Sequence, residues 1–170
     1  MKNITKELLS EFSIFSGLSL EQISPFVTHI KKHNHDKNET IINEGEDGNS
    51  LIFLLSGEVA ITKAMTLMTN KTNLDNREKE ITKLTDRDKP VFGEMSLFDD
   101  NDKRTATILS LSDCITGIIS SKDFFDICNT DPHIGNIVMK NIAGQLAKNL
   151  QKTNMQVLKL TTAFSLILES

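Results

Sequence analysis

The chain lacks tryptophan and tyrosine altogether, and it has only three prolines and two cysteines among 170 residues. Nine phenylalanines and an apolar content of 38% are still sufficient for a compact core. The two thiols, Cys114 and Cys128, stand in separate apolar runs. We therefore interpret them as packing residues in a reducing, cytoplasmic setting rather than as a disulfide scaffold.

Long apolar runs and an excess of basic charge are also missing. No stretch approaches the roughly 18 apolar residues that a membrane span requires, and residues 1–10 lack the apolar region of a signal peptide. The net charge is −4 and the pI about 5.6, whereas nucleic-acid-binding domains usually have a basic face. We therefore expect no membrane association and no DNA binding by this chain as given.

Catalytic motifs are missing as well. The sequence has no Walker loop, no GxSxG and no Cys–His pair in a catalytic context. This favours a binding module over an enzyme.

Residues 1–29 are predicted to form a helical segment. Apolar side chains spaced along one helical face predict a first helix, ended by Gly17, through Ile4, Leu8, Leu9, Phe12 and Phe15. Ser19 and Gln22 form a capping box, which predicts a second helix from residue 20 to about residue 29.

Residues 30–130 alternate short apolar runs with turns, which is typical of an antiparallel β-roll or jelly roll. The runs 50–55 and 58–63, joined by a tight turn, predict two strands that pair with each other. The Asn-rich stretch 64–80 is predicted to be a long connection, and we assign it no function. The fold class is thus mainly β, with flanking helices.

Residues 131–170 are predicted to form a long C-terminal helix. Asp131 is the expected N-cap and Pro132 the first helical residue. The helix has a heptad repeat with Ala143, Leu150, Val157 and Phe164 at a, and Met139, Leu146, Thr153, Leu160 and Ile167 at d. Such a seam favours a parallel homodimer, although an intramolecular amphipathic helix is the alternative.

Residues 92–107, FGEMSLFDDNDKRTAT, carry the chemistry of the chain. Gly93 allows a close backbone approach, and residues 95–98 can form one helical turn whose free N–H groups suit an anion. Arg104 can bind a phosphate bidentately, while Glu94 can accept a hydrogen bond from a sugar hydroxyl. The pattern predicts a site for a small ligand that carries both a phosphate and a ribose.

These residues resemble the phosphate-binding cassette of the cyclic nucleotide-binding domain family. The matching residues are Phe92, Gly93, Glu94, Arg104, Thr105 and Ala106, and Lys103 stands where the family usually has proline. Residues 44–59 carry a second match. The resemblance implies that Arg104 and Thr105 hold the cyclic phosphate and that Gly93 and Glu94 hold the ribose. Met95, Ser96 and Ala106 complete the expected contacts of the cassette.

The long helix resembles that of the catabolite activator branch, in which adjacent hydroxyl residues reach the nucleobase. Thr153 and Asn154 take those positions here. No winged helix-turn-helix follows, so the chain is either a stand-alone sensor or part of a longer protein. Thr105 favours cGMP by analogy with eukaryotic relatives, whereas the helix favours cAMP; we lean slightly to cAMP.

Two other interpretations stay open. The β-roll can serve only for dimerisation or docking, without a ligand. Alternatively, His33, His35 and Glu39 have the spacing of a cupin metal motif. Val27 stands where that motif has glycine, and no second motif follows, so we predict no metal and no cofactor other than the nucleotide ligand.

Overall fold

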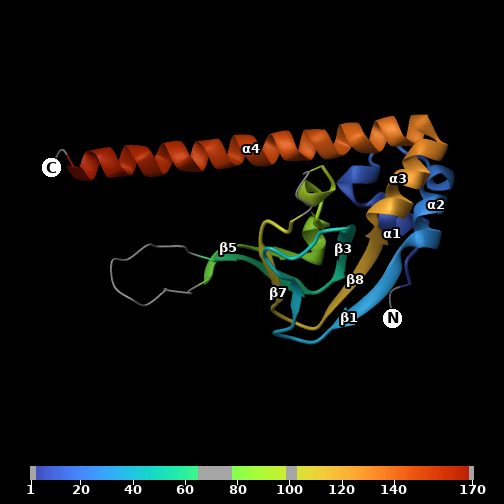
Figure 1. The fold of residues 1–170 in the computed structure, drawn as a ribbon, viewed down its shortest axis with the longest axis horizontal. Helices are drawn as coiled ribbons and strands as arrows, with labels where there is room; N and C mark the ends of the chain where they lie inside the picture. The colour runs from blue at the N-terminus through green and yellow to red at the C-terminus, as the bar shows by residue number, and fades with distance from the viewer. Residues whose placement is uncertain (1–2, 65–77, 99–102, 169–170) are drawn as a thin grey trace.

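The computed structural model describes residues 3–64, 78–98 and 103–168 (Figure 1). Its helices and 3₁₀ turns are α1 (Lys6–Ser10), η1 (Ser13–Phe15), α2 (Leu20–His29), η2 (Asp86–Asp88), η3 (Met95–Leu97), α3 (Ser121–Thr130) and α4 (Pro132–Leu168). Its strands are β1 (Lys31–His35), β2 (Thr40–Ile42), β3 (Ser50–Ser56), β4 (Glu58–Ala64), β5 (Glu78–Thr85), β6 (Val91–Phe92), β7 (Thr107–Ser110) and β8 (Cys114–Ser120).

The strands form two antiparallel four-stranded sheets, ordered β1-β8-β3-β6 and β2-β7-β4-β5. The helices lie to one side of this roll, and α4 runs across it and extends well beyond it (Figure 1). The β-roll with flanking helices and a long C-terminal helix confirms the predicted fold class. The predicted connection at 64–80 lies mostly outside the described residues, but β4 and β5 pair as far as Ala64 and Glu78.

The predicted pairing of β3 with β4 is wrong. Both hydrogen-bonding edges of β3 are filled, one by β8 and the other by β6, so the chain passes into the second sheet, where β4 pairs with β5 and β7. Gly57 makes this crossing with a φ of +105°, and a Cβ there would lie 2.7 Å from the carbonyl oxygen of Asp113. The turn is therefore set by packing between sheets rather than by a local hairpin.

Strand β3 is buried on both faces because it lies between two cores. Leu51, Phe53 and Leu55 face a core shared with the helices, while Ile52 and Leu54 face the interior of the roll. This is the alternation of side chains expected along a strand. The core on the helical side extends from α1 to the first turns of α4, so the helices are held to the roll by one continuous apolar cluster.

The N-terminal helix is shorter than predicted, because α1 ends at Ser10 and η1 follows. The backbone of Phe12 is extended, with φ −81° and ψ 132°. This break allows two rings to meet the same partner: Phe12 lies 5.2 Å from the ring of Phe53 and Phe15 lies 5.8 Å from it. The predicted capping box of Ser19 is confirmed at the start of α2.

Helix α4 has two different halves. Asp131 caps it by accepting hydrogen bonds from the N–H groups of His133 and Ile134, at 3.0 and 3.3 Å, as predicted. The amide of Asn141 donates to the carbonyl oxygens of Ile14 and Ser16, which ties the first half to η1. Beyond residue 146 the apolar side chains are exposed, including Leu150, Val157, Leu160, Phe164 and Ile167. No helix among the described residues is long and apolar enough to span a bilayer.

Candidate functional site

Arg104 is fixed in the structure through its backbone. Its N–H donates to the carbonyl oxygen of Glu46 at 2.9 Å, and its carbonyl accepts from the N–H of Gly45 at 2.8 Å. The adjacent Lys103 ammonium forms an ion pair with Asp47. The turn at residues 44–49 therefore holds the second half of the cassette in place, and the two sequence matches are parts of one structural unit.

The two halves of the cassette are packed closely around glycine. A Cβ on Gly48 would lie 2.6 Å from the Cβ of Ser96 and 3.1 Å from the Cδ of Arg104. Gly93 has a φ of +87°, and a Cβ there would lie 2.5 Å from the carbonyl oxygen of Ser50 and would overlap a terminal nitrogen of Arg104. Both glycines are thus needed to bring the backbone and the guanidinium together.

Arg104 is 7% exposed, and serine residues orient its guanidinium group. Nη1 donates to the Ser50 carbonyl at 3.0 Å and to the Ser96 hydroxyl at 3.2 Å, and Nη2 donates to the Ser50 hydroxyl at 2.9 Å. The Ser96 hydroxyl in turn donates to the carbonyl oxygen of Gly93 at 3.0 Å. The Nε of Arg104 is buried without a hydrogen-bond partner among the described residues. An orphaned, charged donor of this kind calls for an anionic acceptor.

Burial and neighbouring charges have opposite effects on the pKa values of Arg104 and Glu94. Burial lowers the pKa of Arg104, and the carboxylates of Glu46 and Glu94 oppose that effect. Burial raises the pKa of Glu94, and its backbone hydrogen bond and the charge of Arg104 oppose that effect. In both cases burial has a larger effect on the pKa than the charged partners have, and perturbed pKa values of this kind are common at functional sites.

A cavity of about 460 Å³ opens between the cassette and α4. Residues 92–96 and 104–106 line one side, which includes every cassette residue predicted from the sequence. The remaining lining residues are Ile61 and Lys63 of β4, Ile108 of β7, and Asn149 and Thr153 of α4. The volume lies within the range of small-molecule sites, roughly 300–1,000 Å³.

Helix α4 contributes Thr153 to this cavity, but Asn154 is not among the lining residues. The residue on α4 that joins Thr153 is Asn149, and the Thr153 hydroxyl donates to its carbonyl oxygen at 3.0 Å. Residues four apart share a helical face, whereas residues one apart do not. The sequence analysis missed Asn149, although this spacing could have revealed it. The role predicted for Asn154 stays a prediction.

The residues of the cupin-like motif have other partners. His35 Nδ1 lies 2.9 Å from Glu39 Oε1, and its Nε2 lies 3.0 Å from the Thr116 hydroxyl. His33 is exposed. Within the described part of the chain, no group of three His, Cys, Asp or Glu side chains is placed to hold a metal ion.

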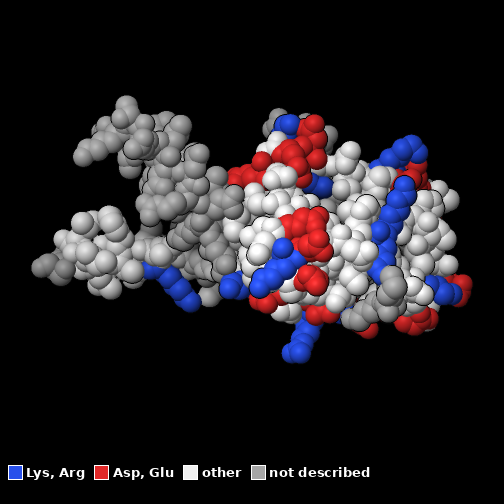
Figure 2. All heavy atoms as spheres, turned by 90° about the horizontal axis from the view of Figure 1, so that it is seen from below, with Lys and Arg blue, Asp and Glu red and all other residues white. Residues whose placement is uncertain are grey.

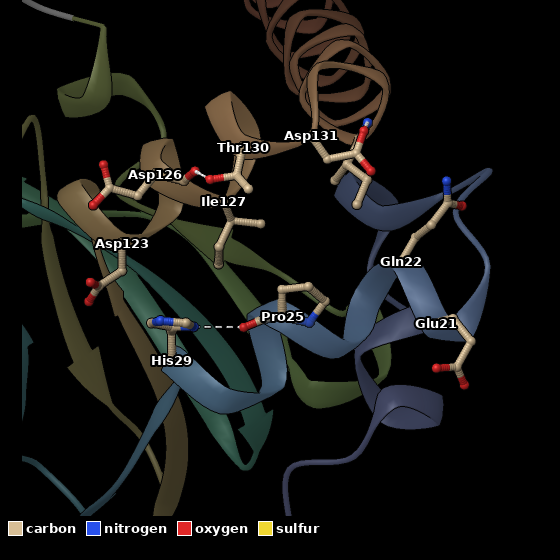
Figure 3. A pocket seen from close by; sticks show the side chains of 10 residues that line it. Glu21, Gln22, Pro25, His29, Asp123, Asp126, Ile127, Thr130 and Asp131 are labelled. Atoms are coloured by element: carbon tan, nitrogen blue, oxygen red, sulfur yellow. Dashed lines mark hydrogen bonds between the residues drawn. The ribbon is translucent and has the colours of Figure 1, made fainter.

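A second cavity, of about 530 Å³, lies between α2, α3 and the start of α4 (Figure 3). Pro25 and Ile127 contribute apolar surface, and Asp123 and Asp126 contribute carboxylates. These carboxylates already have partners: Asp123 accepts from the Ser120 hydroxyl at 2.7 Å, and Asp126 pairs with Lys122 at 2.7 Å. We therefore assign no ligand to this cavity.

The charges on the surface form no band on the face shown in Figure 2. Acidic and basic side chains of the described residues are interspersed there. This face lacks the basic stripe that is typical of nucleic-acid-binding surfaces.

A β-roll that presents a buried arginine and a half-buried glutamate to one cavity defines a binding module for a small anion with hydroxyl groups. Residues 32–131 match the cyclic nucleotide-binding domain family. The chain belongs to this family, and the resemblance of the cassette is confirmed.

Individual relatives agree with this assignment. The cAMP-activated global transcriptional regulator CRP of Pasteurella multocida is 32% identical over 132 residues, which cover 78% of this chain and 56% of that protein. The catabolite activator protein of Thermus thermophilus superposes with a TM-score of 0.71 at 22% identity, over 88% of this chain and 63% of that one. The cAMP-bound structure of PfPKA-R gives a TM-score of 0.57 at 32% identity, over 72% and 39% of the two chains.

The curated relatives are named as transcriptional regulators rather than as enzymes. The chain spans about half the length of the curated relatives it matches, between 54% and 59%. The similarity therefore concerns their nucleotide-binding part rather than the whole proteins.

Proposed function

We propose that this chain is a sensor domain that binds a cyclic nucleotide, cAMP or cGMP, and couples its presence to α4. The observation that carries the proposal is Arg104, which lines the cavity together with the rest of the cassette and whose Nε has no hydrogen-bond partner among the described residues. A cyclic phosphate supplies the anionic acceptors that such a group lacks. The exposed Thr105 and the N–H groups of η3 would complete the phosphate site.

The sugar would be recognised by Glu94. Its half-buried carboxylate accepts no hydrogen bond from a side chain among the described residues. Arg104 acts on it only through its charge, from a distance. A ribose 2′-hydroxyl would supply that donor. Losing a hydrogen bond to a charged group costs about 1.5–3 kcal/mol, so the wild-type chain should bind cyclic ribonucleotides more tightly than their 2′-deoxy forms.

Assembly would involve the second half of α4. Its exposed seam at Leu150, Val157, Leu160, Phe164 and Ile167 is apolar, as expected of a helix that pairs with a second copy. Thr153 is the polar residue on this seam and also lines the cavity. We infer that dimerisation and nucleotide binding are linked through it, and such linkage is reciprocal. In this proposal the chain consists of an N-terminal helical segment (residues 1–29), a nucleotide-binding β-roll (residues 30–130) and a C-terminal dimerisation helix (residues 131–170).

Isothermal titration calorimetry with cAMP and with cGMP tests the proposal. Binding of either nucleotide is expected, and Arg104→Ala should weaken it by about 2–5 kcal/mol, with only partial rescue by Arg104→Lys. Lys122→Ala, which removes a cation outside the cavity, is the matched control. Unchanged affinity in Arg104→Ala would show that the site is elsewhere. A wild-type dimer that binds neither nucleotide would favour the docking-module alternative.

A further inference from the structure

The cavity contains polar groups that neither the phosphate nor the ribose uses. Beyond the cassette, its walls carry the apolar pair Ile61 and Ile108, and then Lys63, Asn149 and Thr153. A nucleotide held by Arg104 and Glu94 would place its base against these residues, because they line the rest of the same cavity. Their hydrogen-bonding capacity therefore decides which base fits.

Lys63 is well placed to contact a base. It lies two residues after Ile61 on β4, so the two side chains share one face of the strand. Ile61 pairs in register with Ile108, which makes an apolar platform on which a base can rest. The Lys63 ammonium forms a long ion pair with the Glu44 carboxylate at 3.8 Å, beyond hydrogen-bonding distance, and its side chain is 55% exposed. Exposed ion pairs contribute little to stability, so the ammonium can turn toward a ligand at a small cost.

The two bases offer Lys63 different partners. A lysine ammonium only donates hydrogen bonds. Guanine presents two acceptors, O6 and N7, on the edge that adenine fills with the N7 acceptor and the N6 amino donor. Thr153 does not separate the two bases, because its hydrogen is already donated to the Asn149 carbonyl and its oxygen can accept from an N–H group of either base.

We infer that Lys63 is a specificity-determining residue that gives the cavity a preference for guanine over adenine. The inference rests on the proposed function and goes beyond it, since it assigns the base. It also runs against the slight lean to cAMP from the sequence of α4, and it concerns a residue of β4 outside the cassette.

Calorimetric titration of three cyclic nucleotides on the full chain tests the inference. cGMP and cIMP both carry the O6 and N7 acceptors, cAMP does not carry O6, and cIMP lacks the amino group of guanine. Wild type should bind cGMP and cIMP about tenfold more tightly than cAMP, as one charge-assisted hydrogen bond provides. Lys63→Met should remove most of this preference by weakening cGMP and cIMP while leaving cAMP nearly unchanged.

General electrostatics cannot produce that result, because the three ligands carry the same phosphate charge and its effect cancels in the affinity ratio. Lys148→Met is the control, since it makes the same change of charge on an exposed residue that does not line the cavity. It should leave all three affinities in their wild-type ratio.

Three outcomes would overturn the inference. The first is a wild-type preference for cAMP. The second is a ratio of cGMP to cAMP affinity that Lys63→Met does not change. A cIMP affinity equal to that of cAMP and below that of cGMP would assign the selection to the guanine amino group instead. In all three cases the proposed function would stand. If no cyclic nucleotide binds the wild type, the proposed function and this inference fall together.

Discussion

The two walls of the cavity are built in opposite ways. The cassette wall is fixed from behind: Arg104 is tied to the turn at 44–49 through its backbone and to Ser50 and Ser96 through its side chain. The α4 wall stands in solvent, and the Thr153 hydroxyl is bonded only within its own helix among the described residues. Under the proposed function, we therefore expect the cassette to supply most of the affinity and α4 to respond to the ligand.

Breaking the exposed seam of α4 should leave the cassette wall intact. Leu160→Glu places a charge on the exposed seam and should convert a dimer to a monomer, because each helix loses roughly 1.5–3 kcal/mol of leucine burial. Analytical ultracentrifugation measures the change. Lys159→Glu alters charge one residue away, outside the seam, and should preserve the dimer. If Leu160→Glu stays as dimeric as the wild type, the seam is not the contact.

Breaking the cassette wall should leave α4 intact. Gly93→Ala forces a side chain into a positive-φ position and against Ser50 and Arg104, so we expect a loss of about 1–3 kcal/mol in stability and a loss of most nucleotide binding. Gly144→Ala on α4 meets no neighbouring atom and should instead stabilise the chain by up to about 1 kcal/mol. Thermal unfolding and calorimetry measure both. If Gly93→Ala and Gly144→Ala change stability and nucleotide binding to the same extent, the proposed contrast between the two walls is wrong.

Thr153→Val tests the connection between the walls. The change completes the apolar seam, so the ligand-free dimer should become tighter. The nucleotide should then strengthen the dimer by less than the 1–3 kcal/mol typical of coupled sites. Sedimentation with and without nucleotide, on both proteins, gives the comparison. A ligand effect that is as large in Thr153→Val as in the wild type would separate Thr153 from the coupling.

The smallest effect concerns the stability of the ligand-free chain. Burial raises the pKa of Glu94 above its ordinary value of 4.5, so the ionised carboxylate costs stability above the raised value, and the cost disappears below pH 4.5. Glu94→Gln should therefore raise Tm at neutral pH, with a gain in the free energy of unfolding on the order of 1 kcal/mol or less, and the gain should shrink on acidification.

The control for this experiment has the opposite sign. A backbone N–H and Thr5 lower the pKa of Glu7, so Glu7→Gln should lower Tm at neutral pH. A Glu94→Gln variant that is less stable than wild type at neutral pH would show that burial does not dominate at this residue.

Local signals in the sequence predicted the parts of the fold that depend on local contacts. The caps at Ser19 and Asp131 and the strand at residues 50–55 were predicted because each depends on neighbouring residues or on apolar content. The pairing of β3 was not, because its edges are filled by strands distant in the sequence. The break in the helix after Ser10 was not predicted, because a continuous helix and a 3₁₀ turn place Phe12 and Phe15 on similar sides of the chain.

The cassette could be predicted because its residues follow one another closely, and residues 92–96 and 104–106, which were predicted to contact the ligand, line the cavity. Lys63 was not predicted, because it reaches the cavity from β4, far from the cassette in the sequence. Asn149 was not predicted either, although it lies four residues before Thr153 on the same face of α4. The pattern of adjacent hydroxyls drew attention to Asn154, whereas a helix brings together residues four apart.

Hydrogen exchange of the backbone amides, measured by mass spectrometry with and without saturating nucleotide, tests the two-walled site most directly. Slower exchange is expected in both walls, at residues 93–98 and 103–106 and around Asn149 and Thr153 of α4. The same nucleotide should give no such protection in Arg104→Ala. Protection confined to the cassette, with α4 exchanging as in the free chain, would contradict the account.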